Sequence, residues 1–216
     1  MGMPITIEIV GDDTNIRNTI EKAFDYFNYV DRKFSTYKDD SEIMRINRGE
    51  VLLENASTDM KTIFNLAQIT KTETGGYFDM TNRDHKYDPS GIVKGWAIYN
   101  ASKILYDSGY RNYYVEAGGD IQLGGFNEKN TKWNIGIKNP LKQDEVVKVV
   151  YLSNEGIASS GTYIRGQHIY NPHNLNEVFD DIVSITVIGP NVYEADRFAT
   201  AAFAMGRSGI AFIEGL

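Results

Sequence analysis

The sequence predicts an α+β fold, in which helices and strands are interspersed without the steady strand-helix alternation of a doubly wound sheet. Two apolar patterns carry this prediction. Spacings of three and four residues indicate amphipathic helices, and strict alternation indicates half-buried strands. At 216 residues the chain is long enough to bury a large core. We find no internal repeat, charge run or proline-rich linker that would divide it.

The first half of the chain is predicted to contain one strand and three helices. Isoleucines alternate with other residues within 1–10, which predicts a strand. A helix over 16–34 follows from one apolar stripe, a second is expected at about 57–73, and a third at 92–107. Glycines follow the second and third helices, where they commonly end helices. The stripe of the first helix is formed by Ile16, Ile20, Phe24, Phe27, Val30 and Phe34.

The second half is predicted to be rich in strands and to contain one further helix. That helix begins near Glu194 and is closed by Gly206. The predicted strands cover 113–115, 133–137, 146–152, 164–170 and 184–188.

Composition excludes several classes of protein. The net charge of −7 repels phosphate backbones, so broad nucleic-acid binding is not expected. Cysteine is absent, which excludes thiolate metal sites, cysteine nucleophiles and disulfides. No stretch approaches the ~20 apolar residues of a membrane span. The expected location is the cytoplasm as the chain stands, or outside the cytoplasmic membrane if a leader has been removed.

Glycine clusters beside carboxylates are the first candidate binding elements. They occupy 75–79, 88–95 and 118–120. Glycine lets a main chain approach a ligand closely, although any one cluster taken alone is more often a helix cap or turn. Neither a Walker A loop nor a GxGxxG motif is present. The sequence therefore does not indicate a P-loop or a Rossmann nucleotide-binding fold.

Asp196 and Thr200 form a sharper pattern near the start of the last predicted helix. Residues four apart lie on one helix face, and two hard oxygens there suit Mg²⁺ better than zinc or copper. Magnesium often takes only one or two carboxylates from protein. The alternative is that Asp196 stabilises the helix N-terminus while Thr200 bonds back to a carbonyl.

His168 is the histidine with the best sequence context for catalysis. It follows a segment of hydroxyl residues and glycine at 159–163, and a neutral imidazole can take a proton from an attacking hydroxyl. His85 and His173 lie in polar, loop-like sequence without a catalytic argument. Four aromatic residues beside these clusters are candidates to stack on a planar ring: Tyr37, Tyr77, Phe78 and Tyr170.

Taken in order, these segments closely resemble the ApbE family, the FAD:protein FMN transferases. The resemblance runs from about residue 30 to 206. It is carried by 34–37, 40–42 with Arg45 and Asn47, 75–79, 88–95, 118–120, 133–140, 159–163, 168–172, 184–188, Ala195-Asp196 and Ala199-Thr200.

The resemblance implies an activity and a set of site residues. Such enzymes use FAD as substrate and Mg²⁺ to attach FMN to a threonine or serine of a target flavoprotein, and AMP leaves. The implied Mg²⁺ ligands are Asp196, Thr200 and the carbonyl oxygen of Gly91, and His168 is the implied base. The implied contacts to FAD are made by Tyr37, Tyr77, Phe78, Asp79, Asp88, Lys94 and Tyr170.

The resemblance also implies an architecture and a partner. One ApbE-like domain over 1–216 is expected, with antiparallel or mixed sheets, packed helices, an active-site cleft between two lobes and a C-terminus shorter than in relatives. The expected partner is a flavoprotein carrying an Asp-x-x-Ser/Thr-Gly-Ala-Thr-like motif. Two alternatives remain: an FAD diphosphatase that gives FMN and AMP, and an FAD-binding protein without catalysis.

Overall fold

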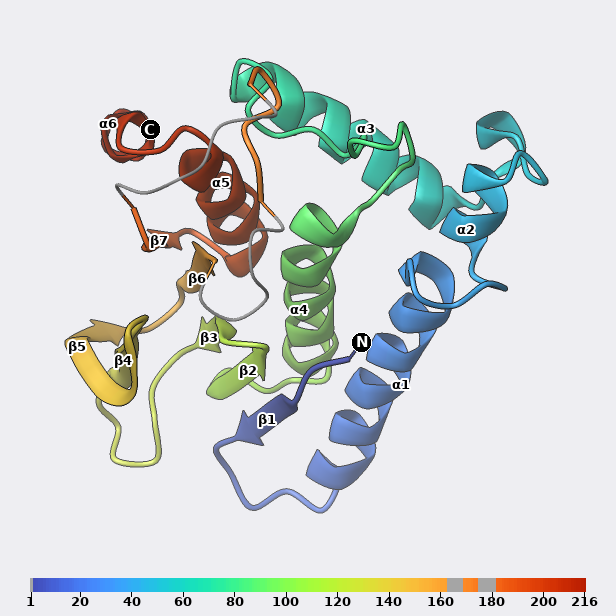
Figure 1. Cartoon of the computed structure of the whole chain (residues 1–216). Coiled ribbons are helices and arrows are strands. Elements are labelled where there is room, and N and C mark those ends of the chain that lie inside the picture. The colour runs from blue at the N-terminus through green and yellow to red at the C-terminus, as the bar shows by residue number, and fades with distance from the viewer. Residues whose placement is uncertain (1, 163–168, 175–181) are drawn as a thin grey trace.

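The computed structural model describes residues 2–162, 169–174 and 182–216, and it shows helices packed against antiparallel sheets (Figure 1). The larger sheet has the strand order β1-β2-β3-β6-β7, with every neighbouring pair antiparallel. A separate two-stranded sheet pairs β4 with β5. The strands are β1 Ile5–Ile9, β2 Tyr113–Ala117, β3 Asp120–Gly124, β4 Trp133–Asn139, β5 Lys142–Leu152, β6 Gly156–Gly161 and β7 Ser184–Gly189.

The helices confirm most of the sequence predictions. The amphipathic stripe forms a helix over its whole predicted length, and the second and third predicted helices are present within about two residues of their expected bounds. Two short helices, α2 and α6, were not predicted. The helices are α1 Ile16–Phe34, α2 Glu42–Asn47, α3 Thr58–Glu73, α4 Ser90–Asp107, α5 Val192–Ala204 and α6 Ser208–Glu214, with a 3₁₀ turn at Leu53–Asn55.

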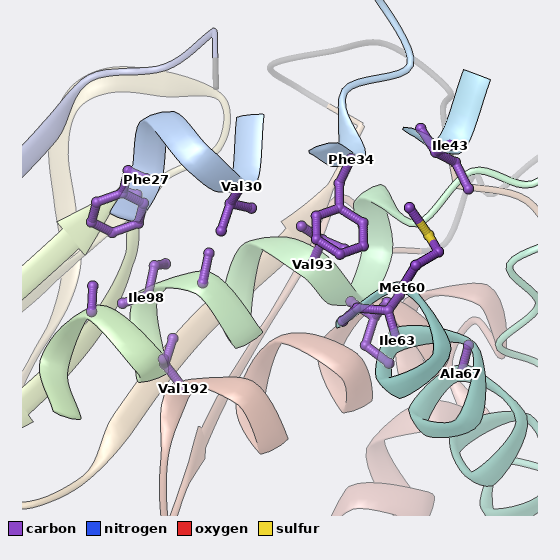
Figure 2. Packing of buried hydrophobic residues seen from close by; sticks show 14 of the residues in the cluster. Phe27, Val30, Phe34, Ile43, Met60, Ile63, Ala67, Val93, Ile98 and Val192 are labelled. Carbon is purple, nitrogen blue, oxygen red and sulfur yellow. The ribbon is translucent and has the colours of Figure 1, made fainter. Parts of the chain in front are cut away.

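The main core lies between α1, α3 and α4. Buried side chains of α1, including Phe27, Val30 and Phe34, point toward Val93 and Ile98 of α4 (Figure 2). The stripe predicted for α1 is therefore confirmed at Phe27, Val30 and Phe34, whereas Phe24 of that stripe is 37% exposed. Because α4 packs on α1 on one side and on α5 on another, it forms the centre of the molecule.

The contact between α4 and α5 depends on Gly95. A methyl group at this position would lie 2.6 Å from Cβ of Asp196 and 2.8 Å from the carbonyl oxygen of Val192. The two helices therefore approach more closely here than any side chain on Gly95 would allow. This approach brings the backbone of α4 against the carboxylate of Asp196.

The β2–β3 hairpin is closed by a two-residue glycine turn. Gly118 and Gly119 both have positive φ, at 61° and 96°, and Ala117 pairs with Asp120 across the turn. Two consecutive positive φ angles are the requirement of the tight hairpin turn that matches strand twist, and glycine meets it without strain. The turn places Asp120 at the first position of β3.

Several sequence predictions need correction. The helix expected to start near Glu194 begins at Val192, and it is followed by α6 after Gly206. Of the strand expected at 164–170, residues 164–168 lie outside the described residues, while Ile169 and Tyr170 are not in a strand. The segment 156–161 is itself strand β6. Among the described helices, none combines the length and apolar character needed to cross a membrane.

Candidate functional site

A cavity of about 870 Å³ lies where the two helices meet the sheets. Its wall is built from the segment 77–91, the start of α4, the β2–β3 hairpin, strands β4 and β6, and α5. This volume is within the range of about 300–1,000 Å³ that is typical of pockets for small molecules and cofactors. Most of the residues predicted to form the site therefore share one cavity.

One end of the cavity brings together Gly91, Asp196 and Thr200. A methyl group on Gly91 would lie 3.2 Å from Cγ2 of Thr200 and 3.7 Å from its Oγ1. One helical turn earlier in α5, Oδ2 of Asp196 accepts the Gly95 N–H at 2.7 Å. Residues separated by more than 100 positions in sequence thus meet because α4 and α5 are in close contact.

The Asp196 carboxylate does not cap the helix that carries it. Asn191 is the N-cap of α5, and its side chain accepts the Glu194 N–H at 3.0 Å. Asp196 is only 2% exposed, and burial raises its pKa to about 7. The attraction of Lys94 opposes this rise and the repulsion of Asp120 adds to it. A buried carboxylate of this kind is stabilised in its charged form by a nearby cation.

Lys94 lies between two buried carboxylates. Its Nζ is 2.6 Å from Oδ2 of Asp120 and 3.5 Å from Oδ1 of Asp196. Asp120 is 1% exposed, and its other oxygen accepts the Ser159 N–H of β6 at 3.1 Å. The arrangement therefore links α4, α5, β3 and β6 at one point of the cavity wall.

The donor set at this end fits Mg²⁺. One carboxylate, one hydroxyl and one carbonyl are hard oxygen donors, and Mg²⁺ commonly completes its shell with waters and substrate phosphates. In the part of the chain that the structure describes, no group of three or more His, Cys, Asp or Glu side chains gathers to hold a metal. That finding is compatible with a site that uses a single carboxylate.

The aromatic part of the cavity wall comes from the segment after α3. Tyr77 and Phe78 line the cavity together with Asp79, whose carboxylate is 2.6 Å from Nζ of Lys71. Tyr170 lies on the same wall, and its hydroxyl donates to the Thr81 carbonyl at 3.0 Å. These predicted contact residues therefore share one side of the cavity.

Asp88 lies at the entry to α4. Its Oδ1 accepts the Ser90 N–H at 3.0 Å, so the carboxylate satisfies a free donor at the helix start. Asn47 fixes the preceding residue, because its side chain donates to the Tyr87 carbonyl at 2.9 Å and accepts the Tyr87 N–H at 2.8 Å. The segment that carries Gly91 is thereby held in place from α2.

Two predicted site residues are not among those that the structure brings together. Tyr37 is 96% exposed and does not line the cavity. His168 lies outside the described residues. His173, in contrast, packs edge to face against Tyr77 with ring centroids 4.7 Å apart, and its Nε2 is 2.9 Å from the Gly75 carbonyl oxygen.

Asp120 belongs to one of the three glycine clusters that the sequence offers as binding elements, but the sequence assigns its carboxylate no specific role. The signal for such a role was its position directly after two glycines that require positive φ. Its pairing with Lys94 was not readable, because only the fold brings β3 next to α4.

Comparison with known proteins identifies relatives of this chain. The model of the ApbE family matches residues 1–84 and 80–216. A FAD:protein FMN transferase of Vibrio cholerae is 34% identical over 128 residues, covering 55% of this chain and 38% of that protein. The Escherichia coli K12 protein of the same name is 29% identical over 128 residues, covering 55% and 36%. These alignments therefore span less than half of the curated relatives' length.

Solved structures show the same fold over the whole chain. The flavin transferase ApbE from Vibrio cholerae superposes with a TM-score of 0.87 at 25% identity, covering 100% of this chain and 88% of that one. The ApbE protein of Thermotoga maritima gives 0.86 at 23% identity, covering 99% and 87%. The α+β fold with antiparallel sheets is confirmed, and the chain belongs to the ApbE family.

Proposed function

We propose that this protein transfers FMN from FAD to a threonine or serine hydroxyl of an acceptor flavoprotein, with release of AMP. The observation that carries the proposal is the cavity in which Asp196, Thr200 and Gly91 gather beside Lys94. The names of the curated relatives, FAD:protein FMN transferase, support the same reaction.

The polar end and the aromatic side of the cavity suit the diphosphate and the ring system of FAD, respectively. At one end the hard oxygens suit a Mg²⁺ ion and the Lys94 ammonium suits the diphosphate, while Tyr77, Phe78 and Tyr170 offer apolar and aromatic surface to a ring system. Asp196, Thr200 and the Gly91 carbonyl would hold Mg²⁺. When bound, Mg²⁺ would neutralise the negative charge that grows on the diphosphate as its bond breaks.

The reaction forms one bond to phosphorus and breaks another. The acceptor oxygen attacks the phosphorus on the FMN side of the diphosphate, the bond from that phosphorus to the bridging oxygen breaks, and that oxygen leaves with AMP. The hydroxyl proton passes to a base, for which we propose His168. The chain's remaining contribution is to hold the diphosphate in line with the acceptor and to limit the access of water.

The test is transfer to a peptide carrying an Asp-x-x-Ser/Thr-Gly-Ala-Thr motif. With FAD and Mg²⁺ the protein should add the mass of FMN to the terminal threonine, as measured by mass spectrometry. Asp196→Asn, which keeps the size of the side chain, should lose most of this transfer. Asp25→Asn, at an exposed position of α1, should retain it.

Two other outcomes separate the alternatives. Steady release of free FMN and AMP, with no labelled peptide, would identify an FAD diphosphatase. Retention of FAD with neither product, and no effect of Asp196→Asn, would identify a binding protein without catalysis. Either outcome would refute the proposed transfer.

A further inference from the structure

Asp120 holds the ammonium group that lies closest to the Asp196 carboxylate. Two carboxylates lie within reach of Lys94. Its Nζ is nearer to Asp120, at 2.6 Å, than to Asp196, at 3.5 Å. Only 17% of the Lys94 side chain is exposed, and the two carboxylate side chains are 1% and 3% exposed. In such a dry environment, an ammonium group pairs closely with the carboxylates within its reach.

The backbone fixes Asp120 independently of Lys94. The residue opens β3 directly after the Gly118–Gly119 turn, and its Oδ1 accepts the Ser159 N–H of β6 at 3.1 Å. Its Oδ2 is therefore presented to Lys94 by two strands of the sheet. The Lys94 ammonium lies at the end of a long, flexible side chain. It can therefore move more easily than the Asp120 carboxylate.

We propose that Asp120 is a positioning residue that holds Lys94 away from Asp196 and thereby keeps the Asp196 carboxylate available to a divalent cation. This inference rests on the proposed function, because the cation is the Mg²⁺ of that reaction. Without the charge of Asp120, Lys94 would pair directly with Asp196 and compete with the cation for the same oxygens. Asp120 thus acts on cation binding through Lys94 without being a ligand itself.

The charge balance points the same way. Asp120 and Lys94 are opposite charges 2.6 Å apart and balance each other, so a cation that enters the site acts on the Asp196 carboxylate and favours its charged form. If Asp120 became neutral, Asp196 and Lys94 would balance each other and the attraction for a cation would fall. Removing Lys94 as well would restore the unbalanced charge at Asp196.

Mn²⁺ binding, followed by electron paramagnetic resonance without FAD, tests this inference. Mn²⁺ shares the preference of Mg²⁺ for oxygen ligands. Asp120→Asn keeps an oxygen that can accept the Ser159 N–H, and it should weaken Mn²⁺ binding by about 10-fold or more, as is typical when a residue behind a metal ligand is changed. The double variant Lys94→Met/Asp120→Asn should recover most of the affinity.

Recovery in the double variant separates positioning from damage to the fold, because both variants carry the same change at Asp120. Glu8→Gln is the matched control. It removes one negative charge from an exposed position on β1, the strand that pairs with β2, and it should change Mn²⁺ affinity by less than about twofold.

Three results would overturn the inference, and they are distinguishable. Unchanged Mn²⁺ affinity in Asp120→Asn would show that Lys94 does not compete. Weak binding that persists in the double variant would make Asp120 a ligand or a structural residue. No Mn²⁺ binding by the unmodified protein, either alone or with FAD present, would remove the cation site of the proposed function, and this inference with it.

Discussion

Replacing Gly95 with alanine is predicted to destabilise the protein and to displace Asp196. The added methyl would lie 2.6 Å from Cβ of Asp196 and 3.0 Å from its Oδ2, whereas carbon atoms in ordinary contact are about 3.5–4.0 Å apart. Part of the clash is with the carbonyl oxygen of Val192, at 2.8 Å, which a change of rotamer cannot relieve. Helices α4 and α5 must therefore move apart.

The size of the effect follows from two opposing contributions. Overpacking of this kind typically costs about 1–3 kcal/mol of unfolding free energy. Alanine is more favourable than glycine within a helix by roughly 0.5–1 kcal/mol, which offsets part of that cost. Contacts below 3 Å place this variant in the upper half of the overpacking range, at about 2–3 kcal/mol, so the expected net loss is about 1–2.5 kcal/mol. For a chain of this size it corresponds to a fall in Tm of roughly 2–10 °C.

Thermal unfolding followed by circular dichroism measures this effect, and Mn²⁺ titration of the folded variant measures the displacement of Asp196. Gly215→Ala is the matched control. Its φ is −91°, and an added methyl would meet nothing closer than 3.4 Å. Its Tm should stay near that of the unmodified protein. If Gly95→Ala were equally stable and bound Mn²⁺ as well, the close approach of α4 and α5 would not be required.

Three further predictions concern the base, the second sheet and alkaline pH. His168→Ala should lower the rate of FMN transfer and leave FAD affinity nearly unchanged, because a base acts on the barrier; unchanged transfer across neutral pH would show that another group takes the proton. Trp133→Phe should lower the unfolding free energy by about 1–3 kcal/mol in urea titration, since it leaves the buried Gly124 carbonyl without the indole N–H that donates to it at 3.0 Å; an unchanged midpoint would contradict this. Burial raises the pKa of Tyr114 to about 12, so the unfolded chain loses this proton first and stability falls as the pH rises from about 10 to 12. Tyr114→Phe should lose less stability over that interval, and an identical loss would show that Tyr114 does not contribute.

The spacing of apolar residues was sufficient to predict the helices and strands that bury one face. The stripe from Ile16 to Phe34 predicts α1 to the residue, because Phe27, Val30 and Phe34 are buried in the core, although Phe24 of the same stripe is 37% exposed. Strand β6 was not predicted, because its sequence of glycine and serine around Ile157 does not alternate between apolar and polar residues. Its residues are buried on both faces of the sheet. The short helix α2 has one visible signal, the N-cap Ser41, and only six residues.

The sequence was sufficient to predict which residues form the candidate site, but not how they are arranged in space. Asp196 and Thr200 are four residues apart, so their shared face can be read from sequence. Their approach to Gly91 depends on the contact between α4 and α5, which no spacing encodes. Lys94 was expected to contact FAD, and the structure adds two carboxylates beside its ammonium group. Tyr37 and His168 remain predictions.

The central claim is that a divalent cation and a flavin dinucleotide share the cavity at Asp196, Thr200 and Gly91. The most direct measurement is an anomalous difference map from crystals grown with Mn²⁺ and FAD. We expect one strong peak between the Asp196 carboxylate, the Thr200 hydroxyl and the Gly91 carbonyl, with diphosphate oxygens completing the shell. FAD bound in the cavity with no peak there, or a peak held by other residues, would contradict the account.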